Sequence, residues 1–330
     1  MNYTDNLSET PEVRRILRSK RRRYEKIIRS KTRPIQPEDT GVEAAALSLG
    51  PIEAVLFDIY GTLLISGSGE VGSTDDSPSK SNENLAFFRS LQEAGFSINV
   101  SAEECEDHAQ RYYVRFIHDS HERQHREGIL YPEVDIISIW YQLILALQEG
   151  GVIGGGLEME RIVEVSLLYE LHSNSVWPMP GARDLLDQLR RNKIPMGIVS
   201  NAQYYTPLIL ETLFNESLEQ LGFLPQLNSW SFSAKCAKPS LDIFAPVMDS
   251  LRKEGIPPEH CVYIGNDMLN DISTAVSLDF KTVLFAGDAR SLRLRSEIQD
   301  LDGLKADAVI VHLSQIRDLL DDISIKEIVT

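Results

Sequence analysis

Short apolar runs alternate with longer amphipathic stretches along the second half of the chain. Short runs rich in β-branched residues predict buried strands, whereas apolar positions that recur every three or four residues predict helices. Strands separated by helices favour a parallel sheet covered on both faces, so we predict an α/β fold with a doubly wound parallel sheet. The predicted elements are helix 181–192, strand 194–199, helix 204–221, strand 229–233, helix 240–254, strand 260–264, helix 270–278, strand 280–285, strand 307–311 and helix 313–323.

A further strand is predicted earlier in the chain, where the apolar run from Ile52 to Phe57 stops at Asp58. Gly61 follows shortly afterwards and indicates a turn. Ligands of open α/β sheets bind at the carboxyl ends of the strands, so Asp58 is a candidate functional carboxylate. The alternative interpretation is that Asp58 is only a turn or cap residue.

The region between these two parts has a helical pattern, with predicted helices at 83–94, 102–127, 135–149 and 157–172. The polar stretch 66–81 before it, which begins with alternating Ser and Gly, predicts a flexible loop. We therefore divide the chain into an amino-terminal segment (1–50), an α/β core (51–81 and 176–330) and a smaller helical domain (82–175).

The amino-terminal segment is basic, although the chain as a whole has a net charge of −16. Residues 1–33 hold eleven Lys/Arg and four Asp/Glu, and the rest of the chain is therefore strongly acidic. A helix is predicted here, followed by a linker over residues 34–51. One interpretation is that the helix contacts nucleic acid or an anionic membrane. The other is that it docks on the acidic body of its own chain, or on that of a second copy in a homodimer. The second interpretation is favoured, because amphipathic charged helices most often cover their own protein. Its apolar positions are Val13, Ile16, Leu17, Tyr24, Ile27 and Ile28.

Composition narrows the class of protein. With 330 residues, 42% hydrophobic and 25% charged, the chain can bury a sizeable core like a soluble globular protein. No apolar run approaches the ~20 residues that a membrane span needs. The acidic balance disfavours nonspecific binding of nucleic acid. Three cysteines without metal-ligand spacing indicate reduced thiols, so we expect a cytoplasmic protein.

Polar residues follow the later predicted strands in a consistent order. Ser200-Asn201 follows strand 194–199, Lys238-Pro239 begins a helix, and Gly265-Asn266-Asp267 follows strand 260–264 with Asp271 beyond.

Together with Asp58, this ordered set resembles the four motifs of the haloacid dehalogenase-like (HAD) hydrolase superfamily, here DIYGTL, SN, KP and GNDMLND, over about residues 50–312. The resemblance implies a Rossmann-like core and a helical cap inserted between the first and second motifs. It also implies a hydrolase that acts on a small-molecule substrate.

The chemistry expected of these residues follows from their types. The Asp58 carboxylate can attack phosphorus or carbon and form a covalent ester. Lys238 can stabilise the charge of an attacked phosphoryl group, and both are predicted to be catalytic. A site rich in carboxylate oxygens suits Mg²⁺. The predicted substrate-binding residues are Tyr60, Thr62, Ser200 and Asn201, and the predicted magnesium ligands are Asp58, Asp267 and Asp271.

Two departures from the phosphatase pattern keep the reaction open. Tyr60 stands where phosphatases of the family usually carry an Asp that acts as general acid/base, and its hydroxyl, with a reference pKa of about 10, is a poor base near neutral pH. A DxYGT arrangement is what the haloacid dehalogenases show, and a halide leaves without a proton. The fourth motif, with Asp267 and Asp271, is closer to the metal-binding phosphatase form, and Phe244 lacks the hydroxyl that dehalogenases tend to present there.

We therefore expect a magnesium-dependent phosphatase acting on a small phosphoester. Hydrolysis of 2-haloacids without metal, and a non-catalytic relative in which Tyr60 has removed turnover, are the alternatives.

Overall fold

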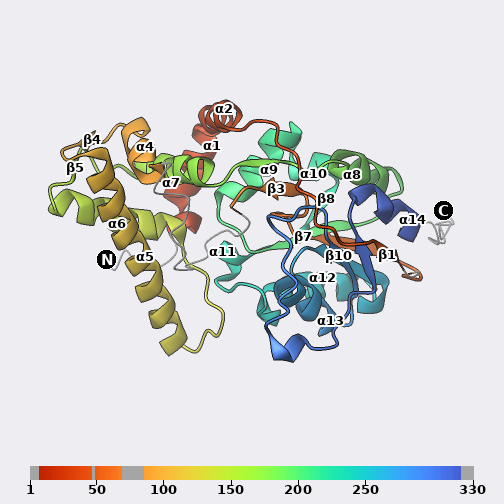
Figure 1. The fold of residues 1–330 in the computed structure, drawn as a ribbon. Coiled ribbons are helices and arrows are strands. Elements are labelled where there is room, and N and C mark those ends of the chain that lie inside the picture. The colour runs from red at the N-terminus through yellow and green to blue at the C-terminus, as the bar shows by residue number, and fades with distance from the viewer. Residues whose placement is uncertain (1–6, 47–48, 69–84, 321–330) are drawn as a thin grey trace.

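The computed structural model describes residues 7–46, 49–68 and 85–320, which form a central sheet flanked by helices beside a second group of helices (Figure 1). The sheet has the strand order β1-β11-β10-β9-β2-β7-β8. All of its pairings are parallel except that of β1, which joins β11 antiparallel. The strands are β1 Ala45–Ala46, β2 Ala54–Phe57, β7 Met196–Ser200, β8 Phe223–Trp230, β9 Cys261–Gly265, β10 Lys281–Phe285 and β11 Ala308–Ile310.

Helices cover both faces of this sheet, because the strands are apolar on both sides. In β2, Val55 and Phe57 join the hydrophobic cluster that includes α8, α9 and α14. Ala54 and Leu56, which point the opposite way, join the cluster that includes α12 and α13. The predicted doubly wound α/β fold is thus confirmed. The helices of this part are α8 Ala182–Arg191, α9 Tyr205–Phe214, α10 Leu218–Leu221, α11 Ser231–Ala234, α12 Ala245–Glu254, α13 Thr274–Val276 and α14 Ile316–Leu320.

The direction in which strands are added to the sheet reverses at β2. The chain first builds β7 and β8 on one side of β2, and then places β9, β10 and β11 on the other side. Connections that diverge in this way leave a crevice at the carboxyl ends of the two strands beside the reversal. Asp58 follows β2 and Asn266 follows β9, so both lie at this point.

The helices between the first and second motifs form the second group, which we call the helical insert (residues 86–173). It contains α4 Ala86–Glu93, α5 Ala102–Arg126, α6 Ile136–Glu149 and α7 Met159–Ser173, with a short hairpin of β4 Ser97–Ile98 and β5 Ile153–Gly154. Aromatic rings fill its centre, where Phe87 stacks on Tyr169 with ring centroids 4.2 Å apart. The chain leaves and re-enters the core through an antiparallel pair, β3 Leu64–Ser66 and β6 Val176–Pro178. Most of the predicted flexible loop, residues 69–81, lies outside the described residues.

Two predicted elements of the core differ from the structure. The helix predicted over 204–221 is two helices, because Asn215 takes a left-handed conformation (φ 59°) and Ser217 caps a new helix, α10. The strand predicted at 229–233 is β8, which ends at Trp230, and α11 follows it. β8 is an edge strand with exposed positions and accommodates Pro225, so its sequence lacks the apolar run of a central strand.

Smaller differences concern how helices begin. Two predicted helices start with a 3₁₀ turn, η2 Leu241–Phe244 before α12 and η6 Leu313–Gln315 before α14, and the helix predicted at 270–278 starts as a π-helical turn, η4 Met268–Ser273. Further 3₁₀ turns are η1 Leu7–Glu9, η3 Pro258–His260 and η5 Gln299–Leu301. The predicted end of the last helix, 321–323, lies outside the described residues.

The basic amino-terminal segment docks on the rest of the chain. Its predicted single helix is two, α1 Pro11–Ser19 and α2 Arg21–Lys31, which meet at Lys20. Val13, Tyr24 and Ile28 are fully buried, as the docking interpretation predicts. Within the predicted linker, β1 pairs with β11 of the core.

None of the helices in the described parts of the chain combines the length and apolar character needed to span a membrane.

The close approach of β7 to its neighbours leads to a prediction for Gly197→Ala. An added Cβ would lie 2.3 Å from the carbonyl oxygen of Leu227 and 2.7 Å from the side chain of Leu56. Overpacking of this kind costs about 1–3 kcal/mol, so the free energy of unfolding should fall by that amount. Urea denaturation followed by circular dichroism measures the change. An unchanged midpoint would show that β8 can shift without cost.

Candidate active site

A lysine joins two aspartates at the carboxyl ends of the central strands. Lys238 Nζ lies 2.7 Å from Asp58 Oδ1 and 2.6 Å from Asp271 Oδ1. Asp58 follows β2 directly, and its backbone N–H donates to Ile264 on β9, which fixes the start of the loop. Only 2% of the Lys238 side chain and 10% of the Asp58 side chain are exposed. Three residues from distant motifs therefore meet in one largely buried network.

The charges of this network depend on one another. Burial by itself lowers the pKa of the Lys238 ammonium, but the Asp271 and Asp58 carboxylates raise it well above its ordinary value. Burial also raises the pKa of Asp271, an effect that Lys238 opposes. Because the ammonium contacts both carboxylates, we take Lys238 as protonated at neutral pH. It thus separates two acids that would otherwise repel each other.

Asn201 positions the backbone of Lys238. Its side-chain Oδ1 accepts a hydrogen bond of 2.7 Å from the Lys238 N–H, and its Nδ2 donates to the Lys238 carbonyl at 3.2 Å. Sequence reasoning assigned Asn201 to substrate binding, but both ends of this amide are already used. The neighbouring Ser200 ends β7 fully buried, and its hydroxyl makes one long contact of 3.4 Å with the Asn201 carbonyl.

Tyr263 belongs to the network although sequence reasoning did not single it out. Its hydroxyl accepts from Lys238 Nζ at 2.9 Å and donates to the Val199 carbonyl at 2.6 Å. Its ring packs on Phe244, with centroids 5.3 Å apart. The sequence does contain a signal for this role. Tyr263 lies at the centre of an apolar strand, and a buried hydroxyl needs a hydrogen-bond partner.

Asp271 also organises the loop after β9. Its Oδ2 accepts hydrogen bonds of 2.9 Å from the backbone N–H groups of Asn266 and Asp267. Gly265 leaves the space that this requires, because a Cβ there would lie 2.3 Å from the Asp271 carboxyl carbon. The loop is therefore folded around the same carboxylate that holds Lys238.

Both carboxylate oxygens of Asp267, a predicted magnesium ligand, contact protein groups in this structure. One of its oxygens accepts from the N–H groups of Leu269 and Asn270 and caps the π-helical turn. The other pairs with Arg295 at 2.7 Å. Of the three predicted magnesium ligands, Asp58 and Asp271 meet at Lys238, but the three do not form a group whose oxygens all lie within 4.8 Å of one another. Within residues 7–46, 49–68 and 85–320, the His/Cys/Asp/Glu group close enough to share an ion is His118, Asp119 and Glu122, which is fully on the surface of α5.

Asn266 is the motif-four residue that reaches the loop after Asp58. Its Oδ1 accepts from the Thr62 hydroxyl at 3.2 Å, and its Nδ2 donates to the Ser291 carbonyl at 2.6 Å. Gly61 makes this contact possible, since its φ is +82° and an added Cβ would lie 2.7 Å from Asn266 and 2.6 Å from Ser291. Thr62, predicted to bind substrate, is thus fully buried in the link between the first and fourth motifs.

Tyr60 points toward the helical insert. Its hydroxyl lies 3.0 Å from the Thr206 hydroxyl on α9, and the Glu170 carboxylate on α7 is close enough to affect its pKa. Glu170 is itself buried and accepts from Tyr205 and Asn174, each at 3.0 Å. Burial and the nearby Glu170 charge raise the pKa of Tyr60 well above its ordinary value. The position of the usual acid/base therefore connects the core to the insert.

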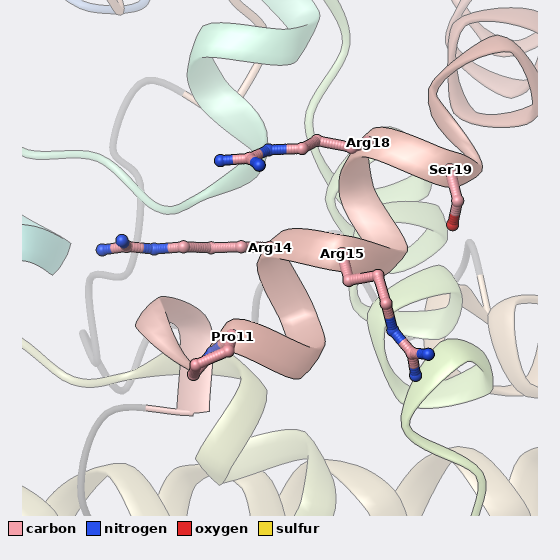
Figure 2. Close-up of a pocket in the computed structure, with 5 residues that line it drawn as sticks. All are labelled: Pro11, Arg14, Arg15, Arg18 and Ser19. Atoms are coloured by element: carbon pink, nitrogen blue, oxygen red, sulfur yellow. The ribbon is translucent and has the colours of Figure 1, made fainter.

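A cavity lies away from these residues, on α1. It has a volume of about 520 Å³ and is lined by Pro11, Arg14, Arg15, Arg18 and Ser19. Arg14 and Arg18 extend from the helix in the same direction, and Arg15 extends to another side (Figure 2). These arginines make no contact with the Lys238 network.

Comparison with known proteins places the chain in a family. The family model of haloacid dehalogenase-like hydrolases matches residues 52–279. The Rhythmically expressed gene 2 protein of Drosophila melanogaster is 29% identical over 142 residues, which cover 41% of this chain and 52% of that protein. An uncharacterized hydrolase of Schizosaccharomyces pombe is 29% identical over 103 residues, 29% of this chain and 42% of that protein. The chain thus spans about half the length of the curated relatives it matches.

Solved structures with a similar arrangement include members with two different activities. A 2-haloacid dehalogenase from Pseudomonas syringae pv. Tomato DC3000 is 19% identical, with 82% of this chain and 98% of that one covered and a TM-score of 0.49. A HAD phosphatase from Thermococcus onnurineus is 18% identical, with 82% and 99% covered and a TM-score of 0.45. The family model spans all four motifs and the helical insert, and Asp58, Lys238 and Asp271 meet inside that range. The chain is therefore a member of the haloacid dehalogenase-like hydrolase family.

Proposed function

We propose that this chain hydrolyses a small phosphoester through attack by Asp58. The observation that carries the proposal is the state of the Asp58 carboxylate. Lys238 holds Oδ1, whereas no hydrogen bond to Oδ2 is found among the described residues. A carboxylate with one oxygen fixed and the other unengaged is suited to act as a nucleophile.

The reaction would proceed in two displacements. Asp58 Oδ2 attacks phosphorus, the bond from phosphorus to the ester oxygen breaks, and the alcohol leaves with a proton taken from solvent. Water then attacks the aspartyl phosphate, releases phosphate and a proton, and restores the Asp58 carboxylate. Lys238 offsets the negative charge in both steps. The N–H groups of Ile59 and Tyr60, for which no partner is found in the described part of the chain, can donate to the phosphoryl oxygens.

The residues present fit a magnesium ion with fewer carboxylates than the sequence suggested. Mg²⁺ in phosphoryl-transfer sites is commonly held by one or two carboxylates together with waters and substrate oxygens. Asp58 Oδ1, which accepts only from Lys238 among the described residues, and the amide oxygen of Asn266 are side-chain oxygens that could still hold the ion, and Asp58 Oδ2 then stays free for the attack. Asp267 and Asp271 have both oxygens occupied by protein donors. The ion would neutralise charge on the phosphoryl group.

A dehalogenase-type reaction is the second candidate, and one observation favours it. Tyr60, the residue in the acid/base position, is held by Thr206 beside the buried Glu170, and burial keeps its hydroxyl protonated. A leaving alkoxide needs a proton, whereas a halide does not. Attack of Asp58 on the carbon of a 2-haloacid would therefore lose nothing from this substitution.

Asp58→Asn should leave the protein folded and remove turnover. An amide is a poor nucleophile, so we expect activity to fall at least about 10³-fold, or about 4 kcal/mol of transition-state stabilisation. Initial rates on a panel of phosphoesters and 2-haloacids measure this. Asp249→Asn, on the exposed surface of α12, is the matched control and should retain full activity. Activity that survives in Asp58→Asn would refute the nucleophile.

Chelation separates the two reactions. EDTA should abolish hydrolysis of a phosphoester, and added Mg²⁺ should restore it, because the phosphoryl charge then lacks its counterion. The same treatment should leave 2-haloacid hydrolysis unchanged. Phosphoester turnover that persists after dialysis against EDTA would contradict the magnesium proposal.

The Tyr60→Asp variant tests whether phosphoester hydrolysis is limited by the lack of a general acid at position 60. Alone, it should destabilise the protein by about 1–3 kcal/mol, because Thr206 loses its partner and the new carboxylate faces the buried Glu170. Combined with Glu170→Gln it should recover stability and raise the phosphoester rate at least about tenfold. Thermal unfolding and kcat of both single variants and of the double variant form the test. Equal rates in the double variant and the parent would indicate that no acid is missing.

A further inference from the structure

The amino-terminal segment lies outside the family match but contacts both parts of the molecule. The match begins at residue 52, whereas η1, α1 and α2 occupy residues 7–31. We call residues 7–33 the strap. In Figure 1 it runs between the helical insert and the core.

On one side the strap is tied to the insert by ion pairs. The guanidinium of Arg23 donates two hydrogen bonds, of 2.5 and 2.6 Å, to the carboxylate of Glu164 on α7. Lys20 pairs with Glu160 on the same helix at 2.9 Å. A further tie joins Lys31 to Glu93 of α4 at 2.6 Å.

On the other side the strap is tied to the core. Arg21 pairs with Glu211 on α9 at 2.9 Å, and Arg29 donates to Asn215 at the end of that helix, also at 2.9 Å. Glu9 accepts a hydrogen bond from Ser233 on α11. Neighbouring residues of one short helix, Arg21 and Arg23, therefore hold the core and the insert respectively.

Buried apolar side chains fix the strap in this position. Tyr24 and Ile28 lie on α2 between the ion-paired residues and are fully buried. Exposed ion pairs stabilise weakly when they are isolated, but here they act together with an apolar anchor. Opening the insert would require one set of ties to break.

The insert also covers the loops that carry the catalytic residues. The Ala237 N–H donates to the Tyr131 carbonyl at 2.8 Å, next to Lys238. The Glu133 carboxylate accepts from Ser231 at 2.5 Å and from Gln203 at 2.9 Å, two residues after Asn201. Since only a tenth of the Asp58 side chain is exposed, substrate reaches it when these contacts separate.

We propose that the strap is a clamp that holds the helical insert closed over the Asp58–Lys238 site and so limits access to it. The proposal rests on the location of the proposed site but not on its reaction. It gives the basic residues of α2 a role within the chain itself, so that binding to nucleic acid or to a membrane is not needed to explain them.

The three cysteines provide a readout that needs no substrate. All are free and buried. Cys236 lies at the contact between insert and core, where its backbone forms an isolated antiparallel β-bridge with Pro132. Its thiol should become accessible when the insert opens. Cys105 lies within α5 and Cys261 within β9, and both should remain covered unless the protein unfolds.

The test compares two pairs of substitutions in the full-length chain. Arg21→Ser with Arg23→Ser removes one tie to each part. Arg18→Ser with Arg22→Ser is the matched control, since no ion pair of either arginine is found in the part of the chain that the structure describes. N-ethylmaleimide labelling of each cysteine is followed by mass spectrometry. We expect the Cys236 rate to rise at least about fivefold in the first variant and to stay unchanged in the control.

A second variant, Tyr24→Ala, removes the apolar anchor and should raise the Cys236 rate further. Cys105 and Cys261 should keep their parental labelling rates in both test variants. An equal rise at all three cysteines would mean that the strap merely stabilises the whole fold, and an unchanged Cys236 rate would mean that it does not restrain the insert. Either result overturns the clamp. Because no turnover is measured, failure here is distinct from failure of the proposed reaction.

Discussion

The placement of one ammonium group between two buried carboxylates is the constraint on which the site depends. Lys238 contacts Asp58 and Asp271 at 2.7 and 2.6 Å, and removing it would leave two acids close together in a medium that screens poorly. The surrounding structure serves this arrangement. The Asn201 side chain hydrogen-bonds to the Lys238 backbone, and the Tyr263 hydroxyl accepts the third hydrogen bond of the ammonium group. Asp271 accepts hydrogen bonds from the loop after β9 and so fixes its conformation.

This arrangement also explains why the chain combines features of two kinds of hydrolase. Asp58 as the proposed nucleophile and Lys238 beside it would serve attack on phosphorus and on carbon equally well, because both reactions develop negative charge near Asp58. The residues that discriminate lie around them. The Tyr60 hydroxyl contacts Thr206 beside the buried Glu170, and Asp267 pairs with Arg295. Under the proposed function, the reaction is decided by how a proton and a cation are supplied at the edge of the Lys238 network.

Enclosure is the second general property of this molecule. The network is nearly solvent-free, and the helical insert contacts the very loops that present Asn201 and Lys238. Low solvent exposure strengthens each electrostatic contact, and under the proposed function substrate entry would require movement. A basic segment outside the family match lies across the two parts that would move. Its charge complements the acidic body of the chain and accounts for the uneven distribution of charge along the sequence.

The sequence by itself determined the alternation of strands and helices, the doubly wound sheet and the four motifs, because each of these is a local pattern of apolar, turn and polar residues. It did not reveal that β8 is an edge strand that begins well before the predicted one, since exposed edge positions remove the apolar signal. It also could not distinguish Asp267 from Asn266, which are adjacent in the chain. Only the tertiary structure decided that Arg295 pairs with Asp267, that Asn266 meets Thr62, and that Tyr263 joins Lys238. These outcomes depend on strand order and on partners 25 to 204 residues away in the chain, and no local pattern encodes such distances.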